Sequence, residues 1–334
     1  MGVVFYLSGE HHALPKNEVY SLLQYYGVQF KTLFDSEQII VLRLKKNVIE
    51  AFQDLAMTHT VLAHLGICSP DLDGIEKIIE RLGRVDDSFS VRVQRIKDSS
   101  KEVSTLALEK NIGQMINGDR VDLKNPKIRI QGFLTENKLV IGREILQTDR
   151  RGIQKRNPKY RPFFHPTSLS PILSKTVCNI CGVNDGKKVL DPFCGTGGLL
   201  IEAGLLGATV HGMDIQKEMV GGTKENLEHY GIKGMIEMGD ATKMDYNNYF
   251  DVVLTDLPYG RASTTKGKQL EDLYSDALNS IYRVLKNNGG ACIISPENVP
   301  VEKMAKTSGF NILKIHLLRV HRSLTRKILI LEKN

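Results

Sequence analysis

The glycine-rich run Val189–Gly198, which reads Val-Leu-Asp-Pro-Phe-Cys-Gly-Thr-Gly-Gly, constrains the fold of this chain more than any other feature. The apolar stretch at its start predicts a strand, and the stretch 199–206 after it predicts a helix. Open parallel sheets bind ligands at such strand-to-helix turns. Gly195, Gly197 and Gly198 permit unusual backbone angles and let a ligand approach the main chain closely. The run therefore predicts a nucleotide-type cofactor site in an α/β domain, with a purely structural turn as the alternative.

Strand-like and helix-like segments alternate throughout the carboxyl-terminal half, which predicts a doubly wound, mainly parallel sheet covered by helices on both faces. The expected strands are 188–191, 209–213, 235–238, 252–255 and 291–295, and the expected helices are 199–206, 217–230 and 270–285. The last two strand-like runs, 312–318 and 327–331, lie too close together for a helical crossover. We therefore expect these two strands to pair antiparallel.

The amino-terminal half predicts a smaller α+β region. Its expected strands are 3–7, 38–44, 89–96, 127–135 and 138–144, and its expected helices are 15–26 and 103–116. A basic segment interrupted by Gly152 and Pro158 follows and is interpreted as a linker. The expected domains are 1–148 for the amino-terminal region, 149–166 for the basic linker and 167–334 for the carboxyl-terminal domain.

Acidic residues end successive strands of the expected sheet. Asp214 follows the second strand, where a carboxylate can accept both ribose hydroxyls, and Asp240 follows the third, where it can accept a bond from an adenine amine. Asp191 would repel a dinucleotide pyrophosphate but suits the ammonium group of S-adenosylmethionine. The dinucleotide pattern is also broken, since its third glycine would fall at Leu200. S-adenosylmethionine is therefore the expected cofactor, rather than a nicotinamide or flavin. The expected cofactor-binding residues are Asp191, Phe193, Gly195, Thr196, Gly197, Asp214, Ile215, Asp240, Ala241 and Asp256.

The run Asp256-Leu-Pro-Tyr-Gly260 follows the fourth expected strand and indicates the chemistry. An amine conjugated to an aromatic ring is a poor nucleophile because its lone pair is delocalised. If the Asp256 carboxylate and the Leu257 carbonyl each accept one amine hydrogen, the nitrogen can aim its lone pair at a sulfonium methyl, and Asp256 can take the released proton. Tyr259 can stack on the base, and Pro258 stiffens the turn. These four residues are the expected catalytic set, with an ordinary turn and a packed tyrosine as the alternative.

A base inside a helix must be unstacked and rotated out to reach such a site, so further nucleic-acid binding surface is expected. The candidates are Arg150, Arg151, Lys155, Arg156, Lys159 and Arg161 in the linker, Arg261, Lys266 and Lys268 after the catalytic motif, and Arg322 and Arg326 near the carboxyl terminus. Each group also fits an ordinary solvated loop or turn.

Composition bounds the partners and the compartment. Hydrophobic residues make up 41% of the chain and charged residues 25%, as in globular proteins, and the net charge of +7 favours a polyanionic partner. Neither a membrane span nor a signal peptide is recognisable, so we expect a cytoplasmic protein without a membrane partner. Only Cys178 and Cys181 have a metal-like spacing, and without a second pair nearby we expect a buried helix face and no metal site.

The runs Asp191–Gly198 and Asp256–Gly260 resemble those of the archaeal tRNA guanosine-10 N2-methyltransferases, in which a THUMP RNA-binding domain precedes a class I methyltransferase domain. Further resemblance lies in the THUMP-like segments Val91–Ile96, Ile112-Gly113 and Val121–Pro126, in the interdomain segment Arg161–Pro166 and in the terminal turn His321–Arg326. The resemblance implies a THUMP core at about 50–148 and a seven-stranded Rossmann-like sheet whose last strand is antiparallel. It also implies that the THUMP domain grips the acceptor end of tRNA while one or two methyl groups are transferred to a guanosine N2.

Several functions remain compatible with the sequence. Related enzymes for tRNA position six and for ribosomal guanine usually carry Asn-Pro-Pro-Tyr or Asn-Pro-Pro-Phe where this chain has Asp256-Leu-Pro-Tyr259, which favours position ten. The alternatives are a guanine N2-methyltransferase for tRNA position six or ribosomal RNA, an adenine methyltransferase acting on DNA, and an RNA-binding protein that has lost catalysis. A small auxiliary protein subunit stays open as a partner beside tRNA.

Overall fold

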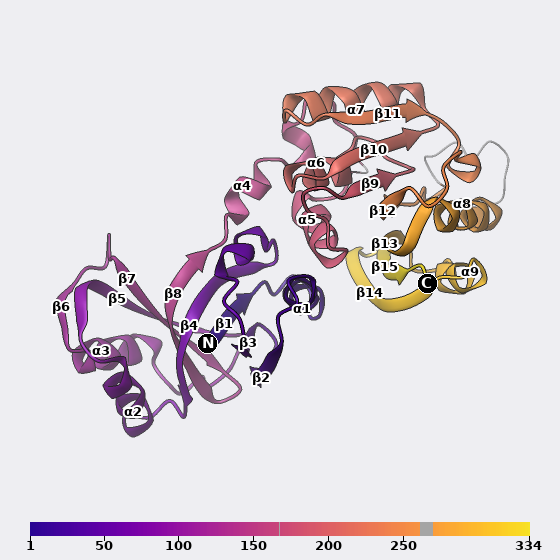
Figure 1. The fold of residues 1–334 in the computed structure, drawn as a ribbon. Coiled ribbons are helices and arrows are strands. Elements are labelled where there is room, and N and C mark those ends of the chain that lie inside the picture. The colour runs from indigo at the N-terminus through magenta and orange to yellow at the C-terminus, as the bar shows by residue number, and fades with distance from the viewer. Residues whose placement is uncertain (167, 261–269) are drawn as a thin grey trace. The chain divides into compact units, whose positions relative to one another are not determined.

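The computed structural model describes the whole chain except residues 167 and 261–269, and it describes residue 119 without its side chain. The chain divides into two compact units, Met1–Asp149 and Arg150–Asn334, each built around its own sheet (Figure 1). Among the described residues, no helix combines the length and the apolar character needed to cross a membrane.

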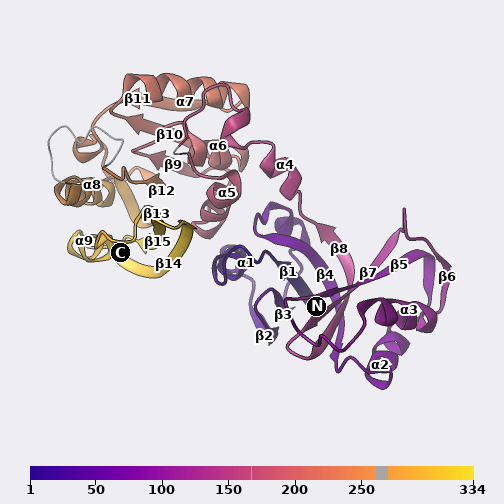
Figure 2. The same cartoon turned by 180° about the vertical axis from the view of Figure 1, so that it is seen from behind.

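The sheet of the second unit has seven strands within the described residues. These are β9 (Lys188–Asp191), β10 (Thr209–Asp214), β11 (Gly234–Met238), β12 (Phe250–Asp256), β13 (Leu285–Pro296), β14 (Asn311–His321) and β15 (Leu324–Glu332). Their order is β11-β10-β9-β12-β13-β15-β14, and only β15 runs antiparallel to its neighbours (Figure 2). The expected doubly wound sheet with an antiparallel final pair is confirmed. The strand order reverses between β9 and β12, which makes the carboxyl ends of these strands the expected ligand site.

Helices cover both faces of this sheet (Figure 1). The helices are α5 (Pro171–Ile180), α6 (Gly198–Leu205), α7 (Lys217–His229), α8 (Leu270–Val284) and α9 (Val301–Thr307). Helix α6 packs against α5 and α7, while α8 packs against α9. Tyr274, Leu278 and Ile281 follow the helical period along one face of α8 and are fully buried against the sheet residues Ile293 and Leu329. This apolar contact anchors α8 on the sheet.

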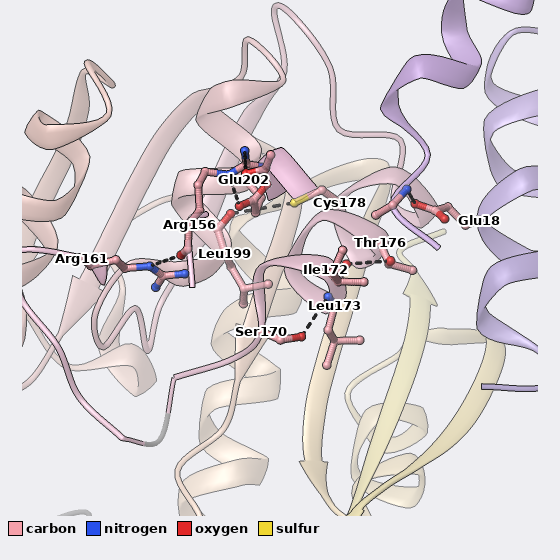
Figure 3. Close-up of polar contacts among 12 residues, drawn as sticks. Glu18, Arg156, Arg161, Ser170, Ile172, Leu173, Thr176, Cys178, Leu199 and Glu202 are labelled. Atoms are coloured by element: carbon pink, nitrogen blue, oxygen red, sulfur yellow. Dashed lines mark hydrogen bonds and ion pairs between the residues drawn. The ribbon is translucent and has the colours of Figure 1, made fainter. Parts of the chain in front are cut away.

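The basic segment after Asp149 belongs to the second unit, where it forms α4 (Arg150–Gln154) and the short helix η2 (Pro158–Tyr160). Arg156 forms a two-pronged ion pair with the buried Glu202, with N···O distances of 2.8 and 2.7 Å (Figure 3). Arg161 is only 4% exposed, and its Nε donates to the Arg156 carbonyl at 3.0 Å. The structure thus engages Arg156 on Glu202 of α6 and buries Arg161, which does not favour the RNA contact expected of these two residues.

Cys178 is buried on α5, in agreement with the expected buried helix face. Its Sγ is 3.9 Å from the carbonyl oxygen of Leu199 on α6 (Figure 3). Within the described part of the chain, no three or more His, Cys, Asp or Glu side chains gather in a way that could hold a metal ion.

The first unit contains an eight-stranded sheet within the described residues, in the order β2-β3-β1-β4-β8-β7-β5-β6. Its elements are β1 (Gly2–Leu7), α1 (Leu14–Tyr25), β2 (Phe30–Asp35), β3 (Ile39–Leu44), η1 (Ile49–Asp54), β4 (Thr58–Cys68), α2 (Leu72–Leu82), β5 (Val85–Arg95), α3 (Thr105–Met115), β6 (Gly118–Val121), β7 (Ile128–Thr135) and β8 (Lys138–Gln147). The expected strands and helices of this half are present. Strands β2, β4 and β6 and helix α2 are additional to the expectation.

Candidate active site

A cleft of about 1220 Å³ opens at the carboxyl ends of the strands of the second unit. It is lined by nearly all of the expected cofactor-binding and catalytic residues, namely Asp191, Phe193, Gly195, Thr196, Asp214, Ile215, Asp240, Ala241, Asp256, Leu257, Pro258 and Tyr259. Gly197 does not line the cleft. The residues expected from four separate strand ends are thus brought together around one space.

The glycine turn is shaped by left-handed backbone and by bonds to neighbouring elements. Gly195 and Gly197 have φ values of 51° and 78°, which glycine adopts without a steric penalty. A Cβ atom on Gly197 would lie 2.9 Å from a methyl group of Thr223, so glycine is also required by packing. The Gly195 N–H donates to Asp214 Oδ2 at 3.0 Å. The turn is therefore fixed against the end of β10, and Gly197 contributes its backbone shape and its packing against Thr223.

Two residues of α7 hold the turn from the other side, and the sequence analysis did not find them. Thr223 Oγ1 donates to the Gly195 carbonyl at 2.6 Å, and Asn226 Nδ2 donates to the Thr196 carbonyl at 2.9 Å. Asn226 also exchanges two hydrogen bonds with the backbone of Phe163. The spacing of 223 and 226 places both on one helix face, which was the available signal.

Asp191 is almost fully buried below the turn. Its Oδ1 accepts bonds from Thr255 Oγ1 at 2.8 Å and from the Phe193 N–H at 3.2 Å. Burial raises the pKa of Asp191 to about 8, and the charges of Asp214 and Asp256 add to the rise. Thr255 was not expected as a site residue, because its bond to Asp191 joins two strands far apart in sequence.

Among the described residues, acidic side chains outnumber basic ones in the lining of the cleft. Burial is the largest cause of the raised pKa of Asp191, Asp214 and Asp256 alike. A ligand that carries cationic groups would favour the ionised carboxylates, whereas a pyrophosphate would add to the repulsion. S-adenosylmethionine carries an ammonium and a sulfonium group, so the residues present fit this cofactor.

Asp240 begins the short helix η3 (Ala241–Lys243). Its Oδ1 accepts bonds from the Thr242 N–H and hydroxyl at 3.0 and 2.8 Å. Ile215 and Ala241 line the same cleft with apolar side chains. This combination of apolar walls with one carboxylate suits the face and the amino edge of an adenine ring.

The catalytic motif begins at the last residue of β12. The Leu257 N–H donates to the Ile294 carbonyl at 2.9 Å, and Tyr274 Oη donates to the Pro258 carbonyl at 2.7 Å. The turn is therefore fastened to β13 and to α8. Such fastening keeps the Asp256 carboxylate and the backbone beside it in a constant geometry.

The Asp256 side chain is 20% exposed and faces the cleft. Tyr259 Oη donates to Asp256 Oδ1 at 2.8 Å, and Arg326 Nη2 lies 3.8 Å from Oδ2. Burial raises the pKa of Asp256 to about 6, while the positive charge of Arg326 and the bond from Tyr259 oppose the rise. A carboxyl group with this pKa is largely ionised at neutral pH and can still take up a proton, as a general base requires.

The remaining basic residues fall into three groups. Arg322 and Arg326 line the cleft, whereas Arg261, Lys266 and Lys268 lie outside the described residues. In the basic segment, Arg151, Lys155 and Lys159 are exposed and Arg150 is half-buried.

The strand order with one antiparallel strand, the glycine turn and the acidic residues at the strand ends together define a class I S-adenosylmethionine-dependent methyltransferase. Residues 158–328 match the family described as RMKL-like, methyltransferase domain, and residues 75–144 match the THUMP domain. The tRNA (guanine(10)-N2)-dimethyltransferase of Methanothermobacter thermautotrophicus is 34% identical over the full length of both chains. The enzyme of the same name from Pyrococcus abyssi is 35% identical over 90% of this chain and 91% of its own. This chain therefore belongs to the family of archaeal tRNA (guanine(10)-N2)-dimethyltransferases, and its cofactor is S-adenosylmethionine.

Solved structures support the fold. TrmN from Thermus thermophilus superposes with a TM-score of 0.57 at 20% identity and covers 100% of both chains. SMU.472, solved in complex with SAH, superposes with a TM-score of 0.56 at 12% identity and covers 100% of this chain and 98% of its own.

Proposed function

We propose that this protein transfers methyl groups from S-adenosylmethionine to the exocyclic N2 of guanosine 10 in tRNA, first giving N2-methylguanosine and then N2,N2-dimethylguanosine. The observation that carries the proposal is the position of Asp256, whose carboxylate faces the cleft from the end of β12 on a turn fastened to β13 and α8. The names of three relatives that match over 90% or more of the chain support tRNA, guanine and position ten.

The chain's own residues activate the amine. In the first transfer, the Asp256 carboxylate and the Leu257 carbonyl accept the two amine hydrogens, which draws the nitrogen out of conjugation and aims its lone pair at the methyl group. In the second transfer, Asp256 accepts the one hydrogen that remains on the nitrogen. When bound, S-adenosylmethionine would supply an electrophilic methyl group on a sulfonium sulfur, with the neutral thioether as the leaving group. Asp256 takes the proton that the amine loses, and the protonated carboxyl group returns it to water. Tyr259 orients the ring of the base.

The first unit, with its THUMP domain, and an exposed surface on the basic segment serve tRNA binding in this proposal. Arg151, Lys155 and Gln154 line a shallow hollow of about 320 Å³ beside Tyr160, which is 60% exposed. Lys159 Nζ lies 4.7 Å from the centre of the Tyr160 ring. An exposed aromatic ring surrounded by cations suits a phosphate backbone with an unstacked base.

The functional division that we propose is 1–148 for RNA binding, 149–166 as the connecting segment and 167–334 for catalysis, in a cytoplasmic protein. A small auxiliary subunit stays open as a further partner. Full activity of the purified chain would refute a requirement for one.

Mass spectrometry of nucleosides from unmodified tRNA incubated with the protein and S-adenosylmethionine tests the proposal, because it reports the base and the number of methyl groups together. We expect N2-methylguanosine early and N2,N2-dimethylguanosine later, with neither product from a folded Asp256→Ala variant. Methylation of adenine, activity only on ribosomal RNA, or full activity of the variant would refute it. A methyl group located at position six by mass spectrometry of tRNA fragments would support the first alternative instead.

A further inference from the structure

Asp256, Tyr259 and Arg326 form a continuous polar chain in the cleft. Arg326 Nε donates to Tyr259 Oη at 2.9 Å, and the same hydroxyl donates onward to Asp256 Oδ1 at 2.8 Å. Arg326 Nη2 lies 3.8 Å from the second carboxylate oxygen of Asp256, and the arginine side chain is only 13% exposed. The guanidinium is therefore turned inward and engaged, rather than extended toward solvent.

The sheet register explains how a residue near the carboxyl terminus reaches the catalytic motif. Asp256 on β12 pairs with Ile294 on β13, while Arg326 on β15 pairs with Pro296, two residues further along the same strand. Neighbouring strands lie about 4.8 Å apart, so β12 and β15 are separated by about 10 Å. An arginine side chain can cross this distance and present two donors at its end.

The hydroxyl of Tyr259 occupies an acceptor oxygen that the target amine needs. Its distance of 2.8 Å from Asp256 Oδ1 is the distance at which an amine N–H donor would bind. An amine that approaches Asp256 Oδ1 from the same direction takes the place of this hydroxyl, and the hydroxyl then requires another partner. Arg326 already contacts the hydroxyl through Nε and can keep it as the tyrosine ring turns toward the base.

We propose that Arg326 is a positioning residue for methyl transfer, which holds Tyr259 through its hydroxyl while the amine replaces that hydroxyl on Asp256. The proposal rests on the proposed function and assigns Arg326 a role inside the cleft, in place of the RNA contact expected from the sequence. When the hydroxyl leaves, the negative charge of Asp256 is exposed to the base. The Arg326 cation near the other carboxylate oxygen then stabilises this charge.

Among the described residues, the charged and titratable groups that interact with Asp256 come from four elements besides its own strand and the turn that carries Tyr259. They are Asp191 at the end of β9, Tyr274 on α8, Cys292 on β13 and Arg326 on β15. Arg326 is the cation of this set, and its attraction opposes the effect of burial on the pKa of Asp256. Its removal should therefore make the carboxyl group harder to ionise, which a phosphate-binding arginine would not do.

The experiment compares Arg326→Gln, Arg326→Lys, Tyr259→Phe and the double variant Tyr259→Phe/Arg326→Gln. The control is Arg319→Gln on the exposed surface of β14, which also removes one arginine charge. Steady-state kinetics on tRNA across a pH series give kcat and KM for each. Separately, carbon NMR of labelled aspartate in the free protein follows the titration of Asp256, assigned by its absence in Asp256→Asn.

We expect Arg326→Gln to lower kcat at least tenfold with KM for tRNA little changed, and to move the titration of Asp256 upward by about one pH unit. Arg326→Lys should restore the titration midpoint but only part of kcat, because lysine keeps the charge without the two-donor fork. At pH values above the titration of Asp256, kcat of the double variant should be close to that of Tyr259→Phe alone, since there the arginine acts through the tyrosine. Arg319→Gln should leave kcat and the midpoint unchanged.

An increase in KM with unchanged kcat and an unchanged midpoint in Arg326→Gln would overturn the proposal in favour of a phosphate contact. Multiplicative losses in the double variant would also overturn it. If Arg326→Gln does not fold, the Arg326→Lys variant tests the proposal in its place. Full kcat in Arg326→Lys would contradict a need for the two-donor guanidinium group. The NMR titration needs no substrate, so absence of guanine methylation by the wild-type protein would refute the proposed function while leaving this measurement to judge the contact of Arg326 with Asp256.

Discussion

Replacing Asp256 by asparagine should abolish catalysis and stabilise the fold. The pKa of Asp256 rises from the ordinary 3.8 to about 6, chiefly because of burial. At about 1.36 kcal/mol per pKa unit, the ionised carboxylate costs the folded state about 3 kcal/mol at neutral pH. Asparagine resembles the protonated acid in shape and carries no charge. We therefore expect Asp256→Asn to raise the free energy of unfolding of the second unit by up to about 3 kcal/mol at pH 7.

The sign of this effect gives it a characteristic pH dependence. A carboxyl group with a raised folded pKa binds its proton more tightly in the folded state, so the wild-type protein gains stability as pH falls from above 6 toward 3.8. The asparagine variant lacks this titration. Its advantage should fall to about half at pH 5 and to less than about 1 kcal/mol at pH 4.

Hydrogen exchange of peptides from β12 and β13 in increasing urea measures this difference, because it follows the unit that contains Asp256 rather than the whole chain. Asp276→Asn on α8 serves as a matched change of carboxylate to amide away from the cleft, and it should show no comparable gain at pH 7 that disappears at pH 4. If Asp256→Asn shows no increase in the free energy of unfolding at pH 7, or an increase that stays constant down to pH 4, then ionisation of the buried Asp256 carboxylate does not destabilise the fold as argued.

Three further predictions concern the cofactor and tRNA. Because burial raises the pKa of Asp191 to about 8, this group is protonated in the free protein at pH 7, and binding of cationic S-adenosylmethionine should release protons. Calorimetry in two buffers of different ionisation enthalpy measures the number of protons released. Identical binding heats in the two buffers would contradict the prediction. Asp214→Asn should weaken S-adenosylmethionine binding by about 10- to 100-fold, since a charged hydrogen bond to the ribose contributes about 1.5–3 kcal/mol, and a calorimetric Kd equal to that of the wild type would count against the assignment. The double variant Arg151→Ala/Lys155→Ala should make the plot of the logarithm of the tRNA association constant against the logarithm of the salt concentration less steep by about 1.8, if each residue neutralises one phosphate. Filter binding measures this slope, and an unchanged slope would exclude this surface from the complex.

The sequence carried enough information to predict the sheet and its ligand edge, because both depend on local signals. The run Val189–Gly198 combines a strand, a turn and a helix start in ten residues, and Asp214 and Asp256 stand at the ends of apolar strands. In a parallel sheet, residues at strand ends meet at one edge whatever their separation in the chain. That rule alone brought the cofactor and catalytic residues together.

The interactions that the sequence did not predict join residues through space. The engagement of Arg326 by Tyr259 depends on the register of β13 and β15, which no local pattern encodes. The burial of Arg161 likewise depends on how the basic segment packs on α6. The sequence alone therefore does not distinguish this buried cation from the exposed cations of the same cluster.

Helix α2 is a different case, because its signal was local and was overlooked. Asp71 caps its first turn by accepting a bond from the Gly74 N–H at 2.8 Å, and Ile75, Ile78 and Ile79 are buried at helical spacing.

Removing the target amine from the substrate tests most directly whether the protein methylates an amine that is bound by Asp256. A tRNA transcript with inosine in place of guanosine at position 10 keeps the rest of the base but lacks the N2 group. With radiolabelled S-adenosylmethionine, we predict full labelling of the guanosine transcript and none of the inosine transcript, although both bind the protein equally within about threefold. Labelling of the inosine transcript at the rate of its guanosine counterpart would contradict the account.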